Sequence, residues 1–149
     1  MAITQAICNS FKQELLEGEH NFKSSGGDVF KLALYTSAAT LNSATTVYPG
    51  DSTGDQVPDS GQYVQGGGTL VNSGTQQVGG VAFCDFADLS FTGVTLTARG
   101  ALIYNTSATV ANAAVAVLDF TTDKTATDGT FTIVFPADTS AAAILRISG

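Results

Sequence analysis

The sequence predicts a mainly β fold, an antiparallel β-sandwich or jelly-roll-like barrel with one N-terminal α-helix. Two patterns carry this prediction. The apolar spacing changes from helical to alternating at about residue 25, and after residue 68 short apolar runs recur between glycine-rich turns. The composition agrees, with 16 glycines and only 13% charged residues. A chain of 149 residues that is 44% hydrophobic has the size and the apolar content of one domain with its own core.

The N-terminal segment predicts a helix that stops at Gly18. Ile7, Phe11 and Leu15 recur every four residues, while charged and amide side chains occupy the other face. Thr4 or Ser10 is a candidate N-cap, and Ser10 with Gln13 has the capping-box spacing. A glycine just past the last apolar residue is a typical helix stop. Two interpretations of the apolar stripe stay open. The helix covers the open face of its own sheet, or it docks onto a partner.

The remaining elements are short strands. Residues 29–35 alternate, with Phe30, Leu32 and Leu34 on one face. Glycines at 93 and 100 and the pair Asp128-Gly129 are expected to be turns, and the last is the clearest tight-turn signal. Further strands are predicted at 69–72, 81–86, 89–91, 95–97, 101–104, 115–120, 130–135 and 143–147.

Within one domain of residues 1–149, the sequence divides into a helix and turn (1–24), a long extended loop or arm (37–68) and a β-rich core (69–149). The arm holds few apolar side chains, so packing on itself cannot offset the entropy lost on ordering it. It is equally well interpreted as an arm lying on a neighbouring subunit or as a floppy surface loop. Residues 50–61 are expected to be poorly ordered or ordered only by another chain, and their deletion is expected to leave the melting temperature nearly unchanged.

Charge and hydropathy argue against several classes of partner. The chain has 6 Lys and Arg against 13 Asp and Glu, a net charge of −7, and its basic residues are scattered. Nucleic-acid binding is therefore not expected. The sequence contains no stretch of 18 apolar residues, so no membrane span is predicted. The first residues lack the pattern of a secretion signal. We expect synthesis in a cytoplasm, where thiols stay reduced.

No residue pattern points to catalysis, a cofactor or a metal, so the sequence predicts a protein that is not an enzyme. His20 is the one histidine, and its polar flanks predict a solvated side chain at the helix end. The carboxylates Asp51, Asp55 and Asp59 are spaced by four residues, which is not the calcium-loop pattern. Asp85 and Asp88 are expected to cap turns.

Five segments resemble parts of one family. They are CNSFKQELL (8–16), FKLALYTS (30–37), RGALIYN (99–105), AVLDF (116–120) and GTFTIVFP (129–136). Together they resemble the small accessory virion proteins of tailed double-stranded-DNA bacteriophages, over nearly the whole chain except residues 47–62. The resemblance carries over no catalytic residue and no cofactor.

The resemblance implies a structural part of the virion. The first reading is a head decoration (cement) protein that binds the major capsid protein from outside as a homotrimer. The alternative is a tail, neck or fibre component that contributes to host attachment. A third class, a sugar-binding module, requires exposed aromatic side chains, for which the four tyrosines Tyr35, Tyr48, Tyr63 and Tyr104 are candidates; tyrosines are more commonly buried or interfacial.

Subunit contacts are expected from the helix stripe and from the arm. The candidate interface residues are Ile7, Phe11, Leu15, Tyr48, Val57 and Tyr63. Cys8 and Cys84 are expected to be small buried side chains that form no bridge within one chain, because assembly occurs in a reducing cytoplasm. The alternative is that one exposed cysteine cross-links neighbouring subunits after lysis.

Overall fold

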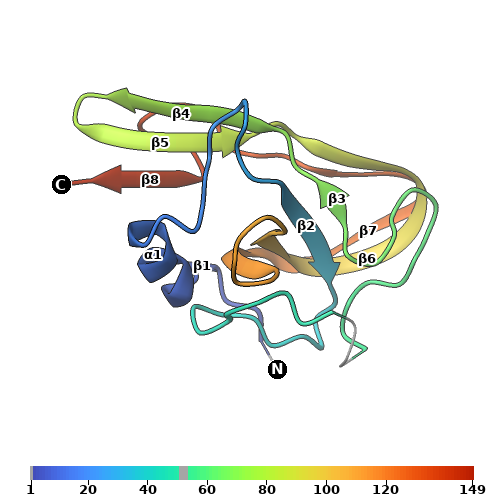
Figure 1. Ribbon diagram of the computed structural model, residues 1–149. Helices are drawn as coiled ribbons and strands as arrows, with labels where there is room; N and C mark the ends of the chain where they lie inside the picture. Colours follow the sequence, from blue (N-terminus) through green and yellow to red (C-terminus); the bar gives the residue numbers. More distant parts are fainter. Residues whose placement is uncertain (1, 51–53) are drawn as a thin grey trace.

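The computed structural model describes residues 2–50 and 54–149. It confirms the predicted class: the chain is mainly β, with two antiparallel sheets and one short N-terminal helix, consistent with a β-sandwich (Figure 1). The larger sheet has the strand order β1-β7-β6-β2-β3 and the smaller one β4-β5-β8. The elements are β1 (Ala6–Ile7), α1 (Asn9–Leu16), β2 (Phe30–Tyr35), β3 (Gly68–Thr69), β4 (Asn72–Val78), β5 (Val81–Phe86), β6 (Leu89–Asn105), β7 (Ala113–Ile133) and β8 (Leu145–Ser148).

Two long strands, β6 and β7, replace five of the short strands that the sequence predicts. The expected turn at Asp128-Gly129 is wrong, because Gly129 pairs with Val94 inside the β6–β7 ladder. Asp128 (φ 51°) and Gly93 (φ 62°) adopt left-handed backbone angles where the register shifts, as bulges do. Gly100 is also not a turn: it pairs with Asp119, and a Cβ there would lie 2.5 Å from the Leu118 carbonyl oxygen.

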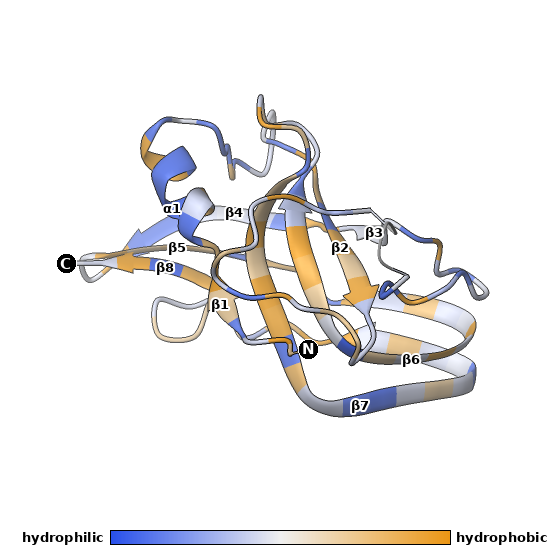
Figure 2. Cartoon of the chain, turned by 90° about the horizontal axis from the view of Figure 1, so that it is seen from below, coloured by the Kyte–Doolittle hydropathy of each residue, from blue (hydrophilic) through white to orange (hydrophobic). Residues whose placement is uncertain are grey.

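Apolar side chains gather where β2, β6 and β7 run side by side (Figure 2). Packed aromatic rings then join this sheet to the smaller one. Phe30 of β2 lies 4.4 Å from Phe22 and 5.8 Å from Phe86 of β5, measured between ring centroids. Phe86 in turn lies 5.7 Å from Phe135. This aromatic cluster fixes the position of the smaller sheet relative to the larger one.

The helix begins and ends where local geometry dictates. Ile7 belongs to β1, and Cys8 is the N-cap without a side-chain hydrogen bond, so both predicted caps, Thr4 and Ser10, are wrong. The predicted stop is confirmed: Gly18 has φ 79° and its N–H donates to the Leu15 carbonyl. α1 packs against β7 and buries Phe11 in the core. For this side chain, the interpretation of a helix covering its own sheet is confirmed.

The arm of residues 37–68 packs on its own domain at Val57 and Tyr63, so the interpretation as a floppy surface loop is wrong at these residues. Contact of the arm with a neighbouring subunit stays a prediction. The Val57 N–H donates to the Leu34 carbonyl, and the Tyr63 hydroxyl accepts a hydrogen bond from the Leu34 N–H at 2.8 Å. Val57 and Tyr63 are 0% exposed. The arm therefore continues the edge of β2 beyond β3 and covers it. Of the predicted poorly ordered stretch 50–61, residues 51–53 lie outside the described residues.

Candidate functional site

An open groove of about 740 Å³ separates α1 from the β4–β5–β8 sheet. Three parts of the chain border this groove: the N-terminal helix, the β4–β5 hairpin and the C-terminal strand. In Figure 1 α1 lies next to β8, and the small sheet extends past the helix. The lining residues are Ile7, Phe11, Lys12, Leu15, Leu16, Phe22, Thr75, Val81, Ala82, Phe83, Cys84, Ser140, Ile144, Leu145, Arg146, Ile147 and Ser148.

The helix side of the groove ends in an exposed leucine. Leu15 is half-buried and packs against the core. Leu16, the last residue of α1, is 91% exposed although it belongs to the groove lining. Because Gly18 ends the helix immediately afterwards, no following turn of helix shields the Leu16 side chain. A large apolar side chain is thus held at the lip of the groove.

The sheet side of the groove is built by cross-strand pairs. Ala82 pairs with Ile147 and Cys84 with Leu145, so these side chains share one face. Ile147 is 59% exposed, whereas Cys84 is buried and Leu145 is half-buried. Phe83, which is buried, pairs with Arg146, and these two residues also belong to the groove lining.

The groove carries positive charge in an acidic chain. Lys12 and Arg146 line it, and none of the described residues that line it is a carboxylate. The Lys12 Nζ donates to Asn9 Oδ1 at 3.3 Å and the Arg146 Nη1 donates to the Ala141 carbonyl at 2.8 Å. Within the described ranges neither cation belongs to an ion pair. Against a net charge of −7, the groove is a local region of opposite sign.

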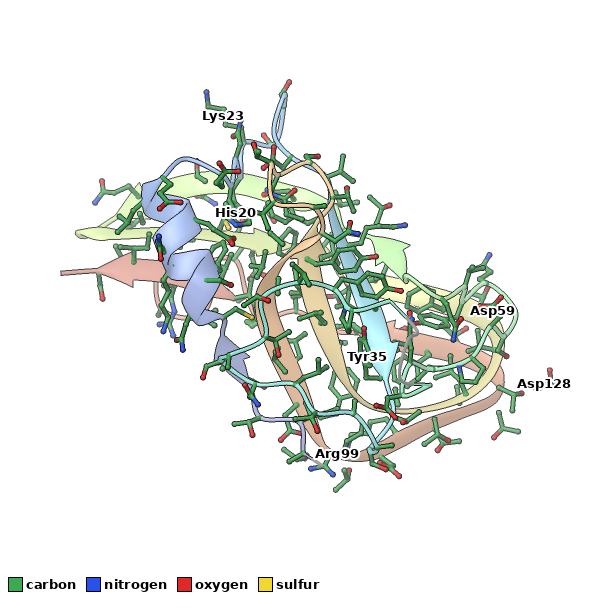
Figure 3. All side chains as sticks on the ribbon, turned by 60° about the horizontal axis from the view of Figure 1, so that its bottom comes forward. His20, Lys23, Tyr35, Asp59, Arg99 and Asp128 are labelled. Carbon is green, nitrogen blue, oxygen red and sulfur yellow. The ribbon has the colours of Figure 1, made fainter. Side chains whose placement is uncertain are left out.

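His20 lies inside the fold rather than in solvent, so the predicted solvated histidine is wrong (Figure 3). Its Nε2 lies 2.7 Å from Glu14 Oε2, and its Nδ1 lies 2.9 Å from Asn105 Nδ2. The Ser107 N–H donates to Asn105 Oδ1, which turns the amide Nδ2 toward His20. Nδ2 also donates to Asp28 Oδ2 at 2.7 Å. This network assigns the proton to Nε2, because Nδ1 must accept.

Both ring nitrogens of His20 are occupied by hydrogen bonds within this network. The His20 side chain is 0% exposed, and Phe11 and Phe30 flank its ring. A general base must reach the proton that it removes. His20 is therefore placed to connect α1 to the end of β6, and it does not open onto the groove. The sequence signal that could have indicated this role is the apolar neighbourhood of Phe22 and Phe30 on the downstream side.

The six predicted interface residues fall into three groups. Ile7 and Leu15 line the groove and remain half-buried. Phe11, Val57 and Tyr63 are buried within the chain, so their side chains are not available at its surface. Their apolar character serves the domain's own core, which the sequence could not distinguish from an interface. Sequence reasoning missed Leu16 and Ile147 as surface residues of the groove.

Tyr48, the sixth residue, belongs to a tyrosine cluster. Its ring stacks on that of Tyr104 with centroids 4.4 Å apart, and its hydroxyl accepts from Gln56 Nε2 at 2.9 Å. Tyr35, Tyr63 and Tyr104 are all buried. The exposed aromatic platform that a sugar-binding module requires is therefore not formed by the four tyrosines.

Both cysteines are free and buried, which confirms the prediction that they form no bridge within the chain. Burial raises the pKa of the Cys8 thiol to about 11 and that of Cys84 to about 12. The alternative of an exposed cysteine that cross-links subunits is not supported, since neither side chain reaches the surface.

No family model, curated protein or solved structure matches this chain. Within residues 2–50 and 54–149, no three metal-ligating side chains gather into a cluster. The helix in the same ranges is too short and too polar to cross a membrane.

Proposed function

We propose that this protein is a non-enzymatic structural component of a tailed-bacteriophage virion, a decoration (cement) protein that binds the head shell as a homo-oligomer. The setting rests on the sequence resemblance. In the structure, the five segments that carry the resemblance belong largely to α1, β2, β6 and β7, the buried framework of the domain.

The observation that carries a binding role is the groove between α1 and the small sheet. It is open to solvent, its walls are mainly apolar, and the exposed side chains of Leu16 and Ile147 border it. A contiguous exposed apolar surface on a folded domain typically marks a contact with another protein. A homo-oligomer of the proposed kind requires such a contact in every subunit.

A non-enzymatic role has support in the way the titratable groups are used. Glu14, His20 and Asp28 bond to one another or through Asn105. Arg99 pairs with Asp119 across β6 and β7 at 3.3 Å. These polar side chains join elements that are distant in the sequence, and that is a structural task.

The test is the location and copy number of the protein in purified virions of the phage that encodes it. We expect antibody label over the head in electron micrographs, and a gel band that approaches the stoichiometry of the capsid subunits. A band of a few tens of copies with label at the tail supports the tail or neck component instead. Particles that lack the protein contradict both versions.

Oligomeric state is a second test of the same proposal. A weak shell contact that is repeated in a linked set of subunits binds far more tightly than the contact alone. We therefore expect light scattering on the purified protein to give a homotrimer. A chain that stays monomeric in solution and on the particle contradicts this part of the proposal.

A further inference from the structure

We propose that the groove between α1 and the β4–β5–β8 sheet is where the subunits bind one another, with the C-terminal end of α1 from a second copy of this chain as its occupant. The inference rests on the homo-oligomer of the proposed function and names the surface that forms it. Two properties of the helix end, one apolar and one electrostatic, match two properties of the groove.

The apolar match involves Leu16. In the isolated chain this side chain is 91% exposed at the end of a helix that stops there. The groove offers apolar surface from Ile147 and from the Ala82 face of the small sheet. Insertion of the neighbour's Leu16 removes both surfaces from water, and apolar burial is the main favourable term in association.

The electrostatic match involves Glu17. It is the C-cap of α1, where the helix dipole places partial negative charge and where a carboxylate is disfavoured. The last turn of α1 contains no basic residue to compensate. Lys12 and Arg146 line the groove without an ion-pair partner among the described residues. A neighbour's Glu17 brought to these cations places its unfavourable charge beside positive charge that has no ion-pair partner among the described residues.

The end of α1 and the groove lie next to each other on one molecule, which suits a symmetric contact. Leu16 belongs to the lining of its own groove, so a symmetry axis passing nearby brings the helix end of each copy to the groove of the next. The contact is then repeated in every subunit, and no copy is left with Leu16 exposed. Such closure limits assembly to a defined oligomer.

The test uses the full chain and measures its mass by sedimentation equilibrium over a range of concentrations. Leu16→Glu adds a charge to the inserted side chain and is expected to weaken self-association roughly 10- to 100-fold, as loss of a buried leucine implies. Glu17→Lys sets a cation against Lys12 and Arg146 and is expected to weaken it roughly 3- to 10-fold. Circular dichroism confirms that each variant is folded.

Two controls match the charge changes. Val71→Glu places the same charge on another exposed apolar side chain, and Asp123→Lys makes the same charge reversal at an exposed position. Neither residue lines the groove. Both controls are expected to associate like the unmodified chain. If they dissociate as much as the groove variants do, net charge rather than the groove governs assembly and the proposal is wrong.

Proximity is tested by mixing two single variants, Leu16→Cys and Ala82→Cys, with a size tag on one of them. Under a mild oxidant we expect a disulfide-linked pair that contains one chain of each kind, since the native thiols are buried. A monomeric unmodified chain, or Leu16→Glu with unchanged mass, overturns this inference. An oligomer that survives Leu16→Glu leaves the proposed function standing, whereas virions without the protein refute that function whatever Leu16 does.

Discussion

In the hydrogen-bond network of His20, each ring nitrogen has one partner, and each donor meets an acceptor. Nε2–H donates to Glu14, Nδ1 accepts from Asn105, and Asn105 uses its second amide hydrogen on Asp28. Polar groups that are buried in this way stabilise a fold only while every member has a partner. The network therefore ties α1, the following loop and the end of β6 into one unit.

Replacing His20 with alanine is expected to lower the free energy of unfolding by about 2–4 kcal/mol, because Glu14 and Asn105 lose their partner and a cavity opens beside Phe11. Urea denaturation followed by circular dichroism measures this change. Lys23→Ala, in the same loop but exposed, is the matched control and is expected to change stability by less than about 0.5 kcal/mol. Equal stability of the two variants contradicts the structural role of His20.

Asp85 is a second residue whose surroundings set its chemistry. It is 1% exposed, its Oδ1 accepts from the Phe86 N–H at 2.8 Å, and burial raises the pKa of its carboxyl above the ordinary value of 3.8. The folded state therefore holds this proton more tightly than the unfolded state. Stability from this residue is present at low pH and is lost as the pH rises from about 3.8 through the folded pKa.

Asp85→Asn keeps the acceptor and removes the charge. We expect the variant to gain stability relative to the unmodified protein as the pH rises from 4 to 7, because only the unmodified chain must ionise a buried carboxyl. Urea denaturation of both proteins at the two pH values gives the difference, in which the other carboxylates cancel. A difference that does not change with pH shows that burial of this charge is not what controls stability here.

At the scale of elements, β-bulges and the arm shape the domain. The bulges at Gly93 and Asp128 let β6 and β7 bend together, and Asp128 lies at the outer end of this pair (Figure 3). The arm closes the free edge of β2, since Tyr35 pairs with Gln56 and Val57 bonds to Leu34. An edge strand covered in this way is not available for pairing with other chains.

Replacing residues 50–61 with a short glycine-serine linker is expected to destabilise the domain by about 3 kcal/mol or more, because burial of Val57 and closure of the β2 edge are both lost. This is the opposite of the unchanged melting temperature that composition alone predicts. Scanning calorimetry measures the effect. Tyr63→Phe, which removes only the hydroxyl that bonds to the Leu34 N–H, is expected to cost about 1–2 kcal/mol. An unchanged melting temperature in both variants contradicts the docking of the arm.

At the scale of the whole molecule, one continuous core extends from the larger sheet through the aromatic cluster to Cys84 in the smaller one. Cys8 lies in the same core beside α1. A thiol in such a place reacts only when the surrounding structure opens. The two cysteines thus report on the opening of two different parts of the molecule.

We expect neither thiol to react with Ellman's reagent at pH 8 in the folded protein, since burial raises the pKa of Cys8 to about 11 and of Cys84 to about 12. Both are expected to react promptly in strong denaturant. Absorbance at the reagent's product band follows the reaction. If one thiol reacts fast under native conditions, the core opens locally at that end. If both thiols react fast, the core is not closed as described.

The sequence by itself determined what depends on neighbours along the chain. Alternation in FKLALY placed β2, the glycine at 18 placed the helix stop, and the mainly β class followed from the change of period. These features arise from local side-chain spacing and backbone preference, so they can be inferred from a short window. The free, buried state of the cysteines followed in the same way from their apolar surroundings.

Only the tertiary structure decided which groups meet across long separations. His20 bonds to Asn105, 85 residues away, whereas its immediate polar neighbours Glu19 and Asn21 predict a solvated side chain. The groove is made from α1, β5 and β8, which come from the start, the middle and the end of the chain. Val57 and Tyr63 are core residues only because β2 has a free edge at which the arm can dock. Local sequence can set which side chains are apolar, but strand pairing and packing decide whether each one is buried in its own domain or left for a partner.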